Sequence, residues 1–280
     1  MTALPAYRLV AFDLDGTLLN FQKEIRPDAR AELLRLHALG VSIVLASGRH
    51  PHGVARVARD LGVDGVVTHL LCFNGGRILD CATGESLVNH TMSAAVARRA
   101  AAAARAAGLA VISYTDDAVV AEQPDNEYVC LEAAVNGLPL RGVQRLDPLF
   151  DGSTNKLLAV GPAKTVDAAE QQLPVQLADI CTVSRSSSVF LEIMPRGIDK
   201  ALSLSLLLDR LGLSPAQMVA FGDGMNDKSM IEFAGVGVAM GNASEEVRRA
   251  ADLITHDCNS NGISSALRAL WPRALYAGKN

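Results

Sequence analysis

Two aspartates separated by one residue end an apolar stretch near the start of the chain, in AFDLDGTLLN (11–20). A strand places Asp13 and Asp15 on the same side, and Gly16 turns the chain immediately after them. Both carboxyl groups would then reach the same small volume. One could attack phosphorus to give an aspartyl-phosphate, and the other could give a proton to the leaving oxygen and later take one from water.

Three further polar clusters follow a predicted strand or begin a predicted helix: Ser47-Gly48-Arg49, Lys200, and Asp223 with Asn226 and Asp227. In an open parallel sheet the ligand site lies beyond the carboxyl ends of the strands, so we expect these clusters to converge there. Grouped carboxylates repel each other unless a cation lies among them, and oxygen ligands of this kind suit Mg²⁺ bound together with a substrate phosphate. Asp13, Asp15 and Asp223 could hold this ion, and Lys200 could neutralise the remaining phosphate charge.

The elements that must position these residues alternate between strand and helix. Apolar runs predict strands at 8–14, 41–46, 65–76, 218–223 and 236–240. Helical spacing and capping residues predict helices at 27–40, 51–62, 200–211, 227–234 and 244–251. Alternation at this spacing is typical of βαβ units and a parallel sheet.

The middle of the chain has a different pattern. Two predicted helices, 94–108 and 165–173, lie among alternating strands at 155–160 and 187–193 and a hairpin, 111–122, that turns at Asp116-Asp117. We therefore predict an α/β protein with a Rossmann-like parallel-sheet core and an inserted α+β cap domain. The predicted core comprises residues 1–84 and 193–280, and the predicted cap comprises residues 85–192.

Composition excludes several classes of protein. The 280 residues carry 26 Lys and Arg against 30 Asp and Glu, a net charge of -4, and the charges are scattered, which argues against a nucleic-acid partner. The five cysteines are odd in number and form no CxxC pair, so neither a disulfide framework nor a zinc site is indicated. No apolar run approaches the roughly 18 residues that span a bilayer. We expect a cytoplasmic protein without a membrane partner.

Four segments, DLDGTLL, LASGR, GIDKAL and FGDGMNDKSM, follow one another in the order of four motifs of the haloacid dehalogenase superfamily of phosphohydrolases, which the chain resembles. The spacing of the second and third motifs, with CFNGG, SVFLEIMPRGIDK and VGVAMGNA, resembles the Cof-type branch (class IIB), which carries an α/β cap inserted there. The match covers nearly the whole chain. One departure is Ala201, where the family usually has glycine after the lysine, and it bears on substrate or packing.

The resemblance implies a role for each motif residue. Asp13 would be the nucleophile, and Asp15 would be the general acid/base and bind Mg²⁺ through its backbone carbonyl, which frees its side chain for proton transfer. The implied phosphate contacts and metal ligands are Ser47, Gly48, Lys200 and Asn226 for phosphate, and Asp13, Asp15, Asp223 and Asp227 for the metal.

These residues predict a Mg²⁺-dependent phosphatase that hydrolyses a small phosphomonoester, such as a sugar phosphate or a phosphorylated cofactor precursor, as a monomer or homodimer. A phosphosugar mutase, which would need an activating bisphosphate, is one alternative. A non-catalytic phosphometabolite-binding protein is another, although the intact motif residues argue against it.

Candidate substrate contacts outside the motif roles are Arg49, Asn74, Arg185 and Glu192, with Tyr114, Asp116, Asp117 and Tyr128 in the cap. Arg49 could instead form a structural ion pair, and Asn74 could serve only a turn. His50 and His52 are expected to face solvent or to cap the helix that follows.

Overall fold

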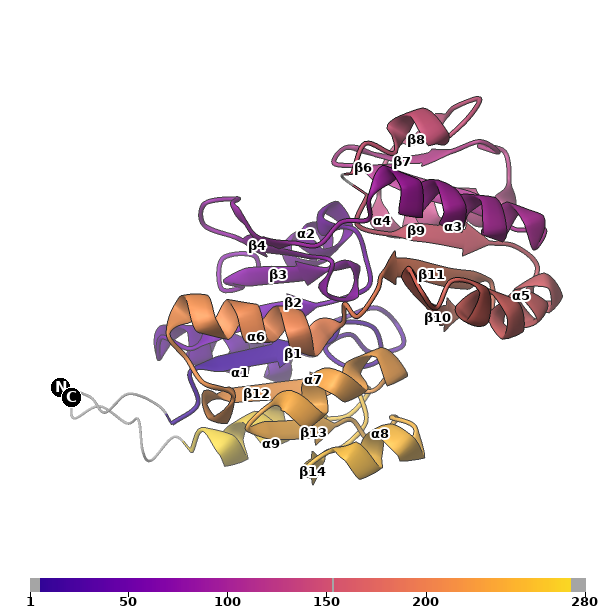
Figure 1. Cartoon of the computed structure of the whole chain (residues 1–280). Helices are drawn as coiled ribbons and strands as arrows, with labels where there is room; N and C mark the ends of the chain where they lie inside the picture. The colour runs from indigo at the N-terminus through magenta and orange to yellow at the C-terminus, as the bar shows by residue number, and fades with distance from the viewer. Residues whose placement is uncertain (1–5, 153, 273–280) are drawn as a thin grey trace. The chain divides into compact units, whose positions relative to one another are not determined.

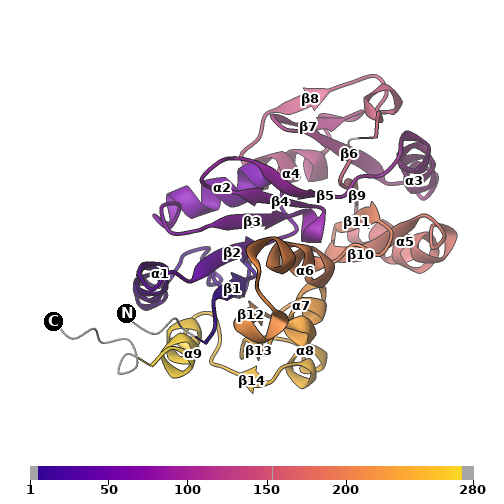
Figure 2. The ribbon, with the colours of Figure 1, turned by 60° about the vertical axis from the view of Figure 1, so that its left-hand side comes forward.

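An eight-stranded sheet organises the first of two units in the computed structural model, which describes residues 6–152 and 154–272 (Figures 1 and 2). The first unit comprises the chain up to Ser47, Val57–Val88 and the chain from Asp199 onward, and the inserted unit comprises Gly48–Arg56 and Asn89–Ile198. The division predicted from the sequence did not foresee that Gly48–Arg56 packs with the insert.

The sheet of the first unit has the order β14-β13-β12-β1-β2-β3-β4-β5. In chain order its strands are β1 Leu9–Phe12, β2 Ser42–Ala46, β3 His69–Cys72, β4 Arg77–Asp80, β5 Ser86–Asn89, β12 Met218–Gly222, β13 Val236–Ala239 and β14 Leu253–Ile254. The strands from β14 to β3 pair in parallel, and β4 pairs antiparallel with β3. This confirms the predicted α/β class with a parallel-sheet core.

Helices cover both faces of this sheet, with α1 and α9 on one side and α6 and α7 on the other (Figure 2). Their bounds are α1 Pro27–Ala38, α6 Lys200–Leu211, α7 Lys228–Phe233, α8 Glu245–Ala250 and α9 Gly262–Leu270, and α2 Pro51–Asp60 lies across the boundary of the two units. Short 3₁₀ turns are η1 Phe73–Gly75, η3 Pro215–Gln217 and η4 Met225–Asp227.

Apolar packing and caps place α6 beside the central strands. Its buried Leu204 and Leu207 pack in one cluster with Leu9 of β1 and Val44 of β2. The Asp199 side chain accepts the Leu202 N–H at the first turn, so the helix begins at Lys200. The predicted cap of α8 is confirmed as well, because the Ser244 side chain accepts the Val247 N–H.

The inserted unit is built on a six-stranded sheet of order β10-β11-β9-β6-β7-β8. Its elements are β6 Ala110–Thr115, β7 Ala118–Ala121, β8 Leu140–Gly142, β9 Leu157–Val160, β10 Cys181–Ser187, β11 Phe190–Pro195, α3 Ala94–Ala106, α4 Glu127–Asn136, α5 Ala163–Gln176 and η2 Asp147–Leu149. The hairpin predicted at Asp116-Asp117 is confirmed, because Thr115 of β6 pairs directly with Ala118 of β7.

Two expectations for the insert were wrong. Only two helices were predicted, but α4 is a third, and it packs Val129 and Ala133 against Ile112 on the sheet face opposite to α3 and α5. Its high apolar content leaves no clear polar face, so its periodicity was weak. The single strand expected at 187–193 instead comprises the end of β10, the turn between β10 and β11, and most of β11.

None of the helices in residues 6–152 and 154–272 combines the length and the apolar character needed to cross a membrane.

Candidate active site

Parallel pairing of β1 with β12 brings two acidic residues together at the carboxyl edge of the sheet. Phe12 and Phe221 are paired in register, and Asp13 and Asp223 follow within two residues of them. The Asp13 N–H donates to the Phe221 carbonyl at 3.0 Å, which continues the ladder to the first aspartate. Residues that are 210 positions apart therefore share one site because their strands are neighbours.

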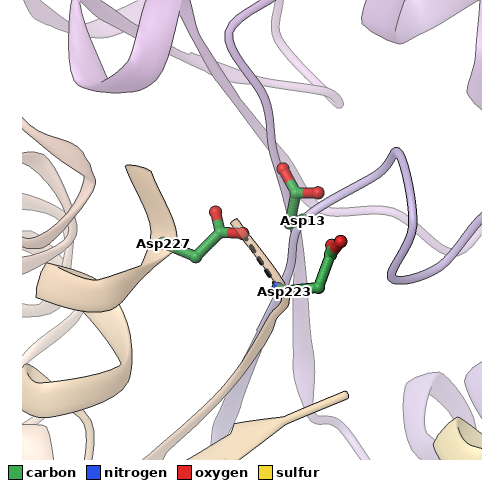
Figure 3. Close-up of side chains that lie close together, drawn as sticks. All are labelled: Asp13, Asp223 and Asp227. Atoms are coloured by element: carbon green, nitrogen blue, oxygen red, sulfur yellow. Dashed lines mark hydrogen bonds between the residues drawn. The ribbon is translucent and has the colours of Figure 1, made fainter. Parts of the chain in front are cut away.

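Asp13, Asp223 and Asp227 form an acidic triad, in which one carboxylate oxygen of each lies within 4.8 Å of the others (Figure 3). Asp13 and Asp227 are buried, and Asp223 is half-buried. Asp227 Oδ2 accepts the backbone N–H groups of Asp223 at 3.1 Å and Gly224 at 2.9 Å, so the turn that follows β12 fixes the orientation of this carboxylate. Three converging carboxylates are an oxygen donor set that fits a divalent cation such as Mg²⁺.

Lys200 lies fully buried beside the triad. Its ammonium donates to Asp13 Oδ1 at 2.7 Å, to Asp227 Oδ1 at 2.5 Å and to the Ala46 carbonyl at 2.8 Å. A lysine ammonium has three N–H donors, and each of them has an acceptor here. The first residue of α6 thus connects the ends of β1, β2 and β12 through one positive charge.

Burial and charge shift the acidity of these groups. Burial, and after it the charge of Asp227, raise the pKa of Asp13 to about 8, although Lys200 opposes the increase. Burial also raises the pKa of Asp223. Burial alone would lower the pKa of Lys200, but Asp13 and Asp227 outweigh it and raise that pKa well above the ordinary value. A divalent cation among the carboxylates would offset their repulsion and favour their ionised forms.

Asp15 is not a member of the triad. Its carboxylate is partly exposed and accepts from Lys23 Nζ at 2.8 Å. The expectation from strand spacing that its side chain joins Asp13 as a ligand is therefore not met, because β1 ends at Phe12 and Leu14 already lies in a turn, so the strand period does not extend to Asp15. A partly exposed carboxylate suits the proton-transfer role that the family resemblance implies for Asp15.

Two residues outside the predicted site residues hold Asp223 in place. Thr17 Oγ1 donates to Asp223 Oδ1 at 2.6 Å, and Asn242 Nδ2 donates to Asp223 Oδ2 at 3.1 Å and to the Gly16 carbonyl at 2.8 Å. Asn242 follows β13, so its place just beyond the carboxyl end of the next strand was the signal that could have identified it.

Gly16 has a backbone conformation and a close contact that together require glycine. Its φ is +87°, and a Cβ at this position would overlap the Asp223 carboxylate. We expect Gly16→Ala to displace that carboxylate and to lower both enzymatic turnover and the free energy of unfolding, the latter by about 1–3 kcal/mol. Urea unfolding and initial rates measure these effects.

Gly40→Ala is the matched control for this substitution. Gly40 has a φ of +75°, but a Cβ added there would have no atom of the described residues within 4 Å, so the variant carries the backbone cost without the clash. If the two alanine variants lost the same stability and the Gly40 variant lost as much activity, contact with Asp223 would not be the reason for the glycine.

The predicted phosphate contacts of the first unit lie on neighbouring loops. Ser47 is buried directly after β2, and its carbonyl accepts the Asn74 N–H at 3.0 Å. Asn226 Nδ2 donates to Asn74 Oδ1 at 3.0 Å, so Asn74 connects the second and fourth motifs. Asn74 itself has a positive φ of 50°, a conformation that asparagine tolerates better than most residues.

The other predicted contacts belong to the inserted unit. The Gly48 carbonyl accepts from Lys156, and Glu192 is buried in an ion pair with the same lysine. Arg185 forms ion pairs with Asp167 and Glu170, so its guanidinium already has a structural role. Arg49 lies in the segment that packs with the insert. As substrate contacts, Arg49, Arg185 and Glu192 stay predictions.

His50 caps the helix that follows, which was one of the two expected outcomes, because its Nδ1 accepts the His52 N–H at 3.0 Å in the first turn of α2. It does not face solvent: it is 2% exposed, stacks on Tyr114, and burial lowers its pKa to about 4. Packing of the segment 48–56 with the insert, which local sequence does not report, buries this side chain.

Several known proteins are similar to this chain in sequence and in fold. The family model of the haloacid dehalogenase-like hydrolases matches residues 10–267. The HMP-PP phosphatase of Serratia proteamaculans is 30% identical to this chain, over 96% of this chain and 97% of the relative. A solved haloacid dehalogenase-like hydrolase from Bacteroides thetaiotaomicron matches with a TM-score of 0.86 and 38% identity, over 94% of this chain and 99% of that one. A solved sugar phosphatase of subclass IIB shares the fold, with a TM-score of 0.79 and 23% identity over 94% and 99% of the two chains.

Proposed function

The chain belongs to the haloacid dehalogenase-like hydrolases, and from this membership we propose that it is a Mg²⁺-dependent phosphatase acting through an aspartyl-phosphate. The observation that carries the proposal is the acidic triad beside buried Lys200 at the carboxyl edge of the sheet. This arrangement suits a phosphate ester, because it combines a carboxylate nucleophile with sites for positive charge.

Asp13, Asp223 and Asp227 would hold the metal, and a bound Mg²⁺ would supply positive charge to the phosphoryl oxygens. The Asp13 carboxylate attacks phosphorus, the bond from phosphorus to the leaving oxygen breaks, and Asp15 gives that oxygen a proton. Asp15 then takes a proton from water as the water attacks the phosphorus of the aspartyl-phosphate, which releases phosphate and restores Asp13. Lys200 keeps the Asp13 carboxylate in place through both steps.

The substrate in this proposal is a small phosphomonoester. The similar proteins named above include an HMP-PP phosphatase and, by fold, a sugar phosphatase, which supports a small phosphorylated metabolite as the substrate. We propose that residues 85–192 act as the cap that selects the leaving group. Phosphate release from a panel of sugar phosphates and phosphorylated cofactor precursors tests the substrate class.

Removal of divalent metal is expected to abolish this activity. After treatment with a chelator, we expect phosphate release from an aryl phosphate to fall at least about 100-fold, because the raised pKa of Asp13 disfavours the ionised nucleophile and the phosphate charge loses the contribution of the divalent cation. Added Mg²⁺ should restore the rate, whereas Ca²⁺, which takes more ligands at longer distances, should restore much less. Full activity in chelator would contradict the metal requirement, and formation of an isomeric phosphate ester without free phosphate would indicate a mutase.

A further inference from the structure

The chain segment that follows Ser47 is anchored in the inserted unit at several points. The Gly48 carbonyl accepts from Lys156 Nζ at 2.8 Å. Two residues later, the His50 N–H donates to Asn136 Oδ1 at 3.1 Å. The phosphate-binding motif is therefore held at its glycine by residues that are remote in sequence.

Ser47 itself is held by the first unit. Its N–H donates to the Leu71 carbonyl at 2.8 Å, and its carbonyl accepts the Asn74 N–H at 3.0 Å. The peptide units on either side of Ser47 are thus fixed by the first unit, and the next one, Gly48–Arg49, is fixed by the insert. Gly48 lies between these two anchors, and glycine has the largest freedom of φ and ψ of any residue.

Lys156, which donates the hydrogen bond to the Gly48 carbonyl, is unusual for a lysine because it is only 3% exposed. Its ammonium lies 3.2 Å from Glu192 Oε1, which is also buried, and 5.4 Å from the centre of the Tyr114 ring. Burying two charges costs free energy that their attraction rarely exceeds, so apolar residues of similar size often serve stability equally well. The feature that apolar residues could not supply is the hydrogen bond to the Gly48 carbonyl.

We propose that Lys156 is a positioning residue for phosphate binding, and this proposal rests on the proposed phosphatase function. Because a peptide unit is planar, holding the Gly48 carbonyl fixes the whole Gly48–Arg49 peptide. The Gly48–Arg49 peptide is then ordered before phosphate binds, so phosphate binding does not carry the entropic cost of ordering it. Glu192 compensates the charge of Lys156, which gives this buried carboxylate a role that does not require contact with substrate.

The test replaces the ion pair with apolar residues in Lys156→Met/Glu192→Leu, which leaves neither charge of this pair buried without its partner. A polar variant, Lys156→Gln/Glu192→Gln, is made alongside it in case the apolar pair disturbs folding. The matched control is Arg105→Met, which breaks the Arg105–Glu122 ion pair of the same unit. Neither residue of that pair has a place in the proposed site.

The main measurement is the dissociation constant of inorganic phosphate in saturating Mg²⁺, followed by KM and kcat for an aryl phosphate. We expect the apolar pair to weaken phosphate binding and to raise KM by about 10- to 100-fold, because a hydrogen bond from a charged group is lost. Mg²⁺ affinity should be unchanged, since the contacts of Lys156 described above lie outside the triad. Arg105→Met should lower the melting temperature without changing phosphate affinity.

Phosphate affinity within twofold of the wild type in a folded double variant would overturn the proposal, even if the melting temperature falls, because Lys156 would then serve stability alone. That result with an active wild-type enzyme would leave the phosphatase function intact. A wild-type protein that neither binds phosphate nor hydrolyses any monoester would overturn the phosphatase function together with this inference.

Discussion

Asp13→Asn is expected to lower phosphate release by about a thousandfold or more, because an amide cannot form the aspartyl-phosphate. The amide oxygen can still accept from Lys200, so the geometry around the ammonium should be kept. Initial rates with an aryl phosphate in saturating Mg²⁺ measure the effect. Retention of most of the activity would exclude Asp13 as the nucleophile.

The same substitution has an expected effect on stability that separates loss of chemistry from loss of fold. Burial, and after it the charge of Asp227, raise the pKa of Asp13 from 3.8 to about 8, so the folded state binds this proton more tightly than the unfolded state. Without divalent metal, the wild type should therefore lose stability from Asp13 as pH rises from about 4 to about 8, and the variant should not. In chelator, we expect the melting temperature of the variant to rise relative to that of the wild type as pH increases over this range.

Asp28→Asn is the control, because folding lowers the pKa of Asp28 whereas it raises the pKa of Asp13. Although Asp28 is partly buried, the Ser264 hydroxyl and Arg26 hold its pKa below the ordinary value. Its ionised form thus stabilises the folded state, and the substitution should lower stability above the ordinary pKa while leaving turnover unchanged. A large loss of activity in this variant would show that general destabilisation, and not the nucleophile, explains the first result.

Lys200→Met is expected to have the largest combined effect on stability and activity. Removing the ammonium leaves Asp13 and Asp227 buried without their cation, which we expect to cost about 3–5 kcal/mol of the free energy of unfolding. Turnover should fall as well, because the nucleophile loses the group that holds it. Urea unfolding and initial rates measure the two losses.

Added Mg²⁺ should stabilise Lys200→Met more than the wild type, since a divalent cation replaces part of the missing positive charge.

Lys228→Met is the control for the loss of stability in Lys200→Met, because Lys228 begins α7 but is a third exposed and pairs with surface glutamates. Lys228→Met should change the free energy of unfolding by no more than about 0.5 kcal/mol. Equal melting temperatures for the two variants would contradict the part assigned to the buried ammonium.

Much of the fold could be predicted from local patterns in the sequence. Apolar runs and helical spacing identified the parallel sheet, and a two-residue turn identified the hairpin at Asp116-Asp117. These signals are local, because strand and helix periods are repeated within a few residues. The helix α4 was missed since its apolar residues show no distinct face in the sequence, and only its packing against the sheet decides which of them are buried.

The sequence by itself determined which residues could carry the chemistry, because four motifs in a fixed order lie at the ends of predicted strands or the start of a predicted helix. Only the tertiary structure decided how these residues share the site. In the tertiary structure, Asp227 lies beside Asp13, and Lys200 has three hydrogen-bond acceptors. The Asp15 carboxylate lies outside the triad and pairs with Lys23, and Asn242 donates a hydrogen bond to Asp223. Side-chain direction at a strand end depends on the neighbouring strands and turns, and these neighbours are up to about two hundred residues away in the chain.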